Sequence, residues 1–415
     1  MTAALARHTE TATPFTAPPI RSRQVRRIRD DAEAIGVATE IAADFAATAA
    51  DRDRNRILPH AELDRLSDAG LLAITVPKAF GGAGVSAGTV ARVIAILSAA
   101  DGSIGQIPQN HFFMLEALRL QGLDDQKRFF YGRVLQGERL GNALSETGTK
   151  TAHDQTTRLL RVGGSYVLKG KKFYSTGVLF ADWIVVVAAA DDERRVVAFV
   201  PKDAAGVTVI DDWSGFGQRV TGSGTTLLDE VEVHPFAVLS FSALFETPTP
   251  MGPFAQIMHA GVQQGIAEGA LAETIRFVRD VARPWKDAGV ERHGDDPHVV
   301  ATVGEVKIRV EGAKALLARA GRFVDAATLE ATAESVAAAS IAVAEAKIAS
   351  TDAALLASSK LIELGGASAT LEKHDLDRFW RNARTHAVHD PQLWKYRFVG
   401  NYWLNGINPP RHGAI

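Results

Sequence analysis

Two long alanine-rich stretches in the last third of the chain constrain the fold more than any other feature. Residues 299–326 and 328–364 carry apolar side chains at helical spacing, with alanine at many positions. Small side chains let neighbouring helices approach closely, as in a tight bundle. A third long helix is predicted over residues 254–281 and should end before the following proline. We therefore expect a C-terminal helical bundle domain over residues 241–415.

The middle third changes to the pattern of β-strands. Residues 183–190 are a continuous apolar run, which is typical of a buried strand. Shorter apolar runs lie at residues 196–200, 207–210 and 227–233. Gly163-Gly164 stands between two further runs and predicts a hairpin, while Gly, Pro and Asp separate the others. The pattern predicts a central antiparallel β domain over residues 138–240.

The first third is again helical. Helices are predicted over residues 32–51, 59–69, 90–100, 109–120 and 125–136. They indicate an N-terminal helical domain over residues 27–137. Residues 1–26 are rich in Thr, Ala, Pro and Arg without periodicity, so we expect a flexible leader; a transit peptide is the weaker alternative because of Glu10 and the prolines. The order of elements predicts an α+β protein with segregated layers.

Composition narrows the possible functions. The 415 residues are 46% hydrophobic and 23% charged, with a formal net charge of −2, so no basic field suggests nucleic acid. No apolar run approaches the roughly 20 residues that span a membrane. The absence of cysteine excludes disulfides, thiolate nucleophiles and Cys-ligated metals, and it fits a reducing compartment. We expect a cytoplasmic protein that binds neither nucleic acid nor membranes.

Several familiar cofactor motifs are missing. No strand–GxGxxG–helix unit predicts a Rossmann nicotinamide site, and there is no phosphate-binding GxxxxGK[ST] loop. His386 and His389 have a spacing that metal ligands can use, but Asp390 is the one further ligand type nearby. We therefore expect no metal site.

Three polar segments of the middle third are candidate ligand contacts. Residues 141–149 are dense in small hydroxyl and amide side chains, which can wrap a flat heterocycle or simply connect two strands. In residues 170–177 aromatic and hydroxyl side chains alternate, so the segment is either a ring-stacking face with Ser175 as donor or an ordinary strand end. Trp213 heads a glycine-rich segment and either walls a pocket or packs in a core.

Two further candidates lie in the last third. Arg283 ends a helix, where a guanidinium can bind phosphate or merely stabilise the helix end. His389 beside Asp390 is a plausible acid–base pair, although sequence neighbours need not face each other and a surface pair is the alternative.

Three segments together resemble the acyl-CoA dehydrogenase superfamily. They are GLLAITVPKAFGGAG, GSYVLKGKKFYSTG, which looks like the family's G-x-x-x-x-G-x-K hairpin, and RNARTHAVHDPQ near the C-terminus. They occur in the family's order over essentially the whole chain after residue 30. The resemblance implies an acyl-CoA dehydrogenase-like fold with an N-terminal helical domain, a central β domain and a C-terminal four-helix bundle, and it implies a flavin.

The chain departs from the family's dehydrogenases at two points. Asp390 stands where they commonly have a glutamate base, and Arg283 is followed by Pro-Trp rather than by a motif ending in Phe-Gly. Both departures resemble the flavin monooxygenase branch, which includes dibenzothiophene monooxygenase and the SfnB family of sulfur-acquisition oxidoreductases. ADGSIGQIPQNH, DDWSGFGQRVTGSG, ARPW and DRFWRNARTHAVHDP carry this resemblance.

The closer resemblance implies a flavin-dependent oxidoreductase that uses reduced FMN from a separate flavin reductase, with FAD as the alternative cofactor. It implies O₂ and a small organosulfur compound as substrates, a role in sulfur metabolism, and a homotetramer. Two alternatives remain open: an FAD-dependent acyl-CoA dehydrogenase with Asp390 as base, and a flavin-binding oligomer without catalytic activity.

The resemblance also implies a set of site residues. The expected flavin contacts are Asn110, Asn142, Ala143, Ser145, Thr147, Phe173, Tyr174, Ser175, Trp213, Arg283, Gly366, Ala367, Ser368 and His389. Ser175, His389 and Asp390 are the expected catalytic residues, with Asp390 orienting His389. Arg283 is expected to hold the flavin phosphate of a neighbouring subunit, with Gly366 to Ser368 nearby.

Overall fold

The structure, a computed structural model, describes residues 15–20, 23–151 and 154–415. The chain divides into two compact units. The sheet unit comprises the described residues of 1–23, 117–213 and 222–244, and the helical unit comprises residues 24–116, 214–221 and 245–415. Each unit is described by itself.

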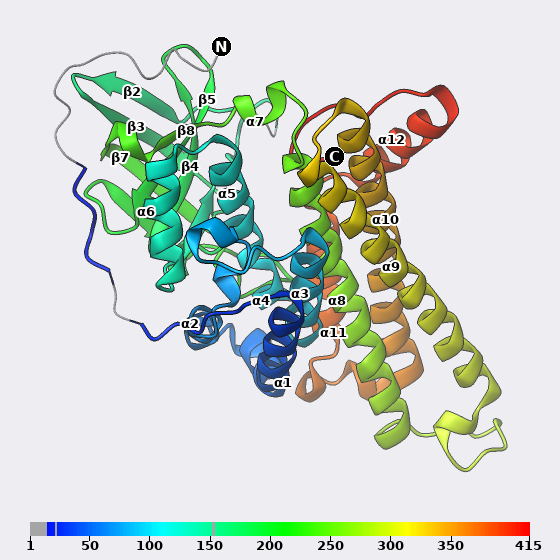
Figure 1. Cartoon of the computed structure of the whole chain (residues 1–415). Coiled ribbons are helices and arrows are strands. Elements are labelled where there is room, and N and C mark those ends of the chain that lie inside the picture. The colour runs from blue at the N-terminus through cyan, green and yellow to red at the C-terminus, as the bar shows by residue number, and fades with distance from the viewer. Residues whose placement is uncertain (1–14, 21–22, 152–153) are drawn as a thin grey trace. The chain divides into compact units, whose positions relative to one another are not determined.

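The sheet unit holds an eight-stranded sheet in the order β6-β7-β3-β2-β4-β5-β8, with β1 also paired to β4 (Figure 1). The strands are β1 Leu140–Ala143, β2 Arg158–Val162, β3 Ser165–Lys172, β4 Trp183–Ala190, β5 Arg195–Pro201, β6 Val207–Ile210, β7 Thr225–Val233 and β8 Val238–Ser240. The predicted apolar run at residues 183–190 is strand β4, and the predicted hairpin joins β2 to β3.

The sheet is mixed, so the prediction of a wholly antiparallel domain is wrong in this respect. β1 runs parallel to the first half of β4, with Leu140 opposite Trp183, and β2 runs parallel to its end, with Arg158 opposite Ala189. The short strands β1 and β2 therefore both run in the same direction as β4. The remaining pairs are antiparallel.

Helix α6 (Asp124–Leu135) supplies aromatic side chains to the core of the sheet unit. The Phe130 ring stacks on Phe199 with 4.3 Å between centroids and meets the edge of Trp183 at 5.3 Å. Residues of the expected flexible leader join this core, since Phe15 packs against Phe236 at 4.9 Å. The leader is therefore not free over its whole expected length; its residues 1–14 and 21–22 lie outside the described ones.

The helical unit is built from helices at both ends of the chain. They are α1 Asp31–Asn55, α2 His60–Asp68, α3 Ala87–Ala100, α4 Gly102–Gln106, α8 Met251–Asp280, α9 Pro297–Leu329, α10 Ala333–Gly365, α11 Asp377–Ala387 and α12 Gln392–Asn405. Helix α5 (Pro108–Gln121) begins in this unit and ends in the sheet unit, and the short α7 (Ala243–Glu246) lies at the second boundary.

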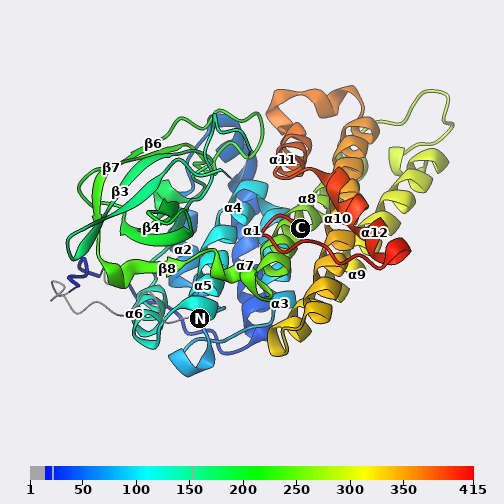
Figure 2. The same ribbon diagram turned by 90° about the horizontal axis from the view of Figure 1, so that it is seen from above.

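Helix α8 is the centre of this unit, with α3, α9 and α10 packed around it (Figure 2). Gly261 and Gly265 allow α3 to approach closely, because a Cβ atom would meet the carbonyl oxygens of Ala91 and Ala95 at 2.7 and 2.2 Å. The first helices and the C-terminal bundle thus form one compact unit, although the sequence separates them by the sheet. The predicted domain boundaries at residues 26, 137 and 240 stay a prediction.

Within the described part of the chain, no helix combines the length and apolar character needed to cross a membrane. The same residues contain no group of three or more histidine, aspartate or glutamate side chains placed to hold a metal ion.

Candidate active site

Two polar segments of the sheet unit lie side by side. The Asn142 amide donates to the Thr176 carbonyl at 3.0 Å, the Asn142 side chain donates to the Tyr174 carbonyl at 3.3 Å, and the Phe173 amide donates to the Ser145 carbonyl at 3.0 Å. The end of β1 and the end of β3 are tied together in this way. Asn142, Ala143, Ser145, Phe173, Tyr174 and Ser175 of the predicted flavin set therefore form one local cluster.

Ser175 is the polar centre of this cluster. Its side chain is buried, and its hydroxyl has no hydrogen-bond partner among the described residues. Its backbone amide is fixed by the Gly224 carbonyl at 3.1 Å. A buried hydroxyl without a partner is costly to the fold, so its presence indicates a ligand atom with which it pairs. The carbonyl oxygens and ring nitrogens of a flavin are suitable acceptors, so this cluster fits the implied cofactor.

Aromatic side chains surround the same cluster. The Tyr174 ring, which is half exposed, meets the edge of Phe173 at 4.8 Å and that of Trp213 at 6.1 Å. Tyr174 adopts a left-handed backbone conformation with φ of 55°, which only a small fraction of residues other than glycine adopt. Such a conformation is commonest at turns and functional sites. Thr147 lies exposed further along the loop.

His389 lies in the helical unit, just after α11. Its side chain is 47% exposed, and its ring packs on that of His259 with 4.1 Å between centroids. The His389 Nδ1 and Asp390 Oδ2 atoms are 3.7 Å apart, which is longer than a hydrogen bond. The role of Asp390 in orienting His389 therefore stays a prediction, and the contact that the structure gives the His389 ring is with His259.

The Asp390 carboxylate contacts two lysines. Its Oδ1 accepts a hydrogen bond from Lys347 Nζ at 2.6 Å and lies 3.4 Å from Lys395 Nζ. All three side chains are buried. Burial raises the pKa of Asp390, but Lys347 and the other nearby cations outweigh it and hold that pKa well below its ordinary value. Asp390 is thus a permanent anion in this site.

A chain of hydrogen bonds fixes the imidazoles behind His389. Gln218 Nε2 donates to the Gly102 carbonyl at 3.1 Å and faces His386 Nδ1 at 3.4 Å, and His386 Nε2 lies 3.3 Å from His259 Nδ1. Because an amide nitrogen can only donate, His386 accepts at Nδ1 and donates from Nε2 to His259. Burial lowers the pKa of both His259 and His386 well below the ordinary value. His389 therefore packs on a neutral, oriented ring.

The predicted phosphate contacts lie at another end of the helical unit. Arg283 is exposed just beyond the end of α8, and Gly366, Ala367 and Ser368 follow α10. His293 links these two regions by a 2.8 Å hydrogen bond to the Leu364 carbonyl. Helical rise places the end of α8 roughly 31 Å along its axis from His259. Three further residues cannot span that distance, so within one chain Arg283 lies far from His259 and from the His389 ring packed on it.

Asn110 lies on α5 as a buried residue whose side-chain nitrogen has no partner among the described residues.

Sequence reasoning missed four residues that support the predicted ones: His259, Lys347, Lys395 and Gln218. Each is a polar residue on a buried face of its element, which is a signal in the sequence. The partners of His259, Lys347 and Gln218 are distant in sequence, whereas Lys395 lies five residues from Asp390.

Family comparisons agree with the order of elements. Models of the acyl-CoA dehydrogenase N-terminal, middle and C-terminal domains match residues 28–138, 143–231 and 257–391. The dibenzothiophene monooxygenase of Rhodococcus qingshengii is 34% identical over 409 residues, which cover 93% of this chain and 97% of that protein. The probable FMNH2-dependent monooxygenase SfnC of Pseudomonas putida is 32% identical over 386 residues, which cover 91% and 96%.

Solved structures give the same result. The crystal structure of FMN-bound TdsC from Paenibacillus sp. A11-2 superposes with a TM-score of 0.88 and 34% identity, and the match covers 92% of this chain and 100% of that one. The resemblance inferred from the C-terminal run and the β hairpin is confirmed, and so is the expected fold. The chain belongs to the acyl-CoA dehydrogenase family.

Proposed function

We propose that this protein is a monooxygenase that uses reduced FMN and O₂ to transfer one oxygen atom to a small organosulfur compound. The relatives named above support this reading: one is a dibenzothiophene monooxygenase, one is named FMNH2-dependent, and one was crystallised with FMN. Reduced FMN supplies the two electrons that activate O₂, and the second oxygen atom leaves as water. A separate reductase regenerates the reduced flavin.

The unpartnered hydroxyl of Ser175 is the observation that carries the proposal. It is a preoriented donor in a dry environment, beside the Asn142 and Tyr174 segment. Donors that are fixed before the reaction stabilise developing charge without reorganising. Ser175 therefore holds the flavin or the activated oxygen by a hydrogen bond.

His389 is the proposed proton-handling residue. Imidazole is the side chain that most often transfers protons in enzymes, and the His389 ring packs on His259 while its side chain remains 47% exposed. His389 is therefore suited to give a proton to the leaving oxygen or to hold a hydrogen bond to it. Asp390 and its lysines fix the backbone from which His389 projects.

The same geometry disfavours the dehydrogenase alternative. A base that abstracts a proton next to a thioester needs a pKa near the working pH. Asp390 is held far below that range by Lys347 and Lys395. An aspartate in this environment is a poor base.

We further propose that the protein acts in the cytoplasm as a homotetramer. In one chain Arg283 lies beyond the end of α8, far from His259 and His389, which supports a flavin site that a second copy completes with its own Arg283. Helix α12 also exposes several large apolar side chains: Leu393 (81%), Trp394 (50%), Tyr396 (51%), Trp403 (67%) and Leu404 (84%). Such a face is typical of a protein interface.

The test combines flavin identification with a product assay. Purified protein is supplied with FMN, a flavin reductase and NADH, and a panel of a sulfide, a sulfone and a sulfonate is analysed by mass spectrometry. We expect an oxygenated product that depends on FMN. Binding of FAD, together with bleaching of that FAD by an acyl-CoA, would contradict the proposal.

A further inference from the structure

Lys172 follows Gly170 in the β2–β3 hairpin as Gly-x-Lys, and none of the functions above uses it. It ends β3, directly before the Phe173–Ser175 segment, and its side chain is fully buried, with 0% exposure. The neighbouring Lys171 is exposed. A lysine is almost never fully buried unless it is paired, so the position demands an explanation.

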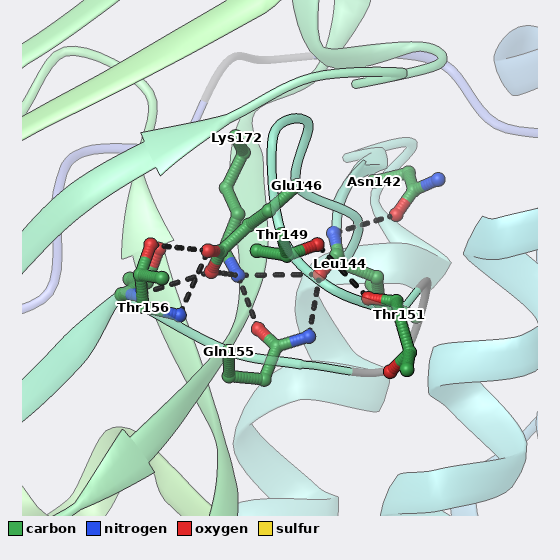
Figure 3. A network of polar contacts seen from close by, with 9 residues as sticks. Asn142, Leu144, Glu146, Thr149, Thr151, Gln155, Thr156 and Lys172 are labelled. Carbon is green, nitrogen blue, oxygen red and sulfur yellow. Dashed lines mark hydrogen bonds and ion pairs between the residues drawn. The ribbon is translucent and has the colours of Figure 1, made fainter.

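All three protons of the Lys172 ammonium have acceptors (Figure 3). Nζ donates to Glu146 Oε1 at 2.7 Å, to Gln155 Oε1 at 2.5 Å and to the Leu144 carbonyl at 3.2 Å. Burial lowers the pKa of Lys172 to about 8, and Glu146 partly opposes this, so the ammonium stays charged at neutral pH.

Glu146 joins the two ends of the loop that follows β1. Its carboxylate accepts from the Thr156 amide at 2.8 Å, the Thr157 amide at 3.0 Å and the Thr156 hydroxyl. Residues 144–146 are thereby tied to residues 155–157 across the loop, with Lys172 at the centre. We call Lys172, Glu146 and Gln155 the loop latch.

The latch acts on the peptide between Leu144 and Ser145. The Leu144 carbonyl accepts from both Lys172 Nζ and Gln155 Nε2, the latter at 3.3 Å. In a planar trans peptide the carbonyl and the following N–H point in opposite directions. The Ser145 amide therefore points away from the latch, and it has no acceptor among the described residues. The Ser145 carbonyl on the other side is fixed by the Phe173 amide.

We infer that Lys172 is a positioning residue for flavin binding: by holding the Leu144 carbonyl it aims the Ser145 amide at the bound flavin. The inference rests on the proposed function, because it takes the ligand of this cluster to be FMN. The loop latch then has a role beyond stability, because it orients the Ser145 amide, a donor that has no acceptor among the described residues of the flavin-free protein.

The variants must separate positioning from folding. Lys172→Met alone leaves the buried Glu146 charge without its partner, which is strongly destabilising. The double variant Lys172→Met/Glu146→Gln removes both charges and keeps one of the two acceptor oxygens that the Thr156 and Thr157 amides use. Lys171→Met is the matched control, one residue away on the exposed side of the same strand.

Two readouts on the full-length protein test the inference. Equilibrium dialysis under nitrogen measures the affinity for reduced FMN, and deuterium uptake without flavin measures the mobility of residues 144–157. We expect the double variant to melt near the wild-type temperature, to bind FMN at least about tenfold more weakly, and to exchange faster in the loop. Lys171→Met should match the wild type in both readouts.

Wild-type affinity and faster loop exchange in the double variant would overturn the inference and leave the proposed function intact. Failure of the wild-type protein to bind FMN would instead overturn the proposed function. If the double variant does not fold, Gln155→Ala decides, because it removes one tether to Leu144 from a partly exposed position. We expect this variant to bind FMN several-fold more weakly, and an unchanged affinity would overturn the inference.

Discussion

The Ser175 hydroxyl is buried without a partner among the described residues. Its removal should therefore have opposite effects on the stability of the flavin-free protein and on the affinity for FMN. Ser175→Ala should leave the free energy of unfolding of the flavin-free protein unchanged or raise it by about 1 kcal/mol, because an unsatisfied group is removed. The affinity for FMN should fall roughly tenfold, because a donor is lost. Chemical denaturation and equilibrium dialysis measure the two effects.

Ser223→Ala provides the contrast, since the Ser223 hydroxyl pairs with Thr176 Oγ1 at 2.7 Å. We expect it to lower the free energy of unfolding by about 1 kcal/mol. A destabilised Ser175→Ala protein with wild-type FMN affinity would mean that the hydroxyl serves the fold and not the flavin.

Lys347 and Asp390 form a buried ion pair, so removal of one member alone should destabilise the fold. Lys347→Met should lower the free energy of unfolding by about 3 kcal/mol, because Asp390 loses its nearest cation. The double variant Lys347→Met/Asp390→Asn should recover only part of that loss, because the buried Lys395 ammonium then loses its anion. Denaturation in guanidinium chloride is the measurement.

Lys360→Met is the matched control on the same helix. Its pair with Glu363 is largely exposed on the glutamate side, so the loss should stay within about 1 kcal/mol. Equal losses for Lys347→Met and Lys360→Met would contradict the account of Asp390 as a buried anion held by Lys347.

The loop after β1 is the element whose stability should depend on pH in the acidic range. Burial raises the pKa of Glu146, but hydrogen bonds from Lys172 and Thr156 outweigh it and bring the pKa to about 2, against an ordinary value of 4.5. A carboxyl group with a lowered pKa stabilises the fold above its ordinary pKa and loses that contribution as the pH falls.

We therefore expect residues 144–157 to open progressively between about pH 4.5 and pH 2, before the buried strand β4 does. Deuterium uptake resolved by peptide follows the two regions separately. Glu146→Gln should remove this pH dependence from the loop. A loop whose protection in the wild type is flat across that range would contradict the assigned ion pair.

Elements with strong local signals could be predicted, and those defined by distant pairing could not. Strand β4 was predicted with its observed bounds because residues 183–190 are apolar throughout. The parallel pairing of β1 and β2 with β4 was missed, since register depends on contacts across the loop between them. Helix α10 begins at Ala333 rather than near residue 328, because Thr332 caps it through the Ser335 amide.

The site could be predicted in part for the same reason. Asn142, Ser145, Phe173 and Ser175 meet because the ends of β1 and β3 are neighbours. The nearest partner of Asp390, Lys347, comes from α10, 43 residues away in sequence, so nothing near Asp390 indicates it; Lys395, five residues further along the chain, was overlooked.

At the scale of the whole molecule, the separation of Arg283 from His389 predicts complementation between subunits. Arg283→Ala and His389→Phe should each abolish most activity alone. Chains carrying one substitution each, expressed together, should assemble with some sites that hold both wild-type residues, and these sites should restore a fraction of the activity. Mixing the separately purified, stable oligomers is the control and should restore little. Inactive mixed oligomers would contradict a site shared between copies.

The central claim is that the protein transfers oxygen with reduced FMN. A single-turnover experiment tests it most directly: protein, chemically reduced FMN and the organosulfur panel are mixed with oxygen-18-labelled O₂, without a reductase, and the products are analysed by mass spectrometry. The account predicts one labelled oxygen atom in a sulfur product for each reduced FMN consumed. Quantitative release of the label as hydrogen peroxide, with every compound of the panel unchanged, would contradict it.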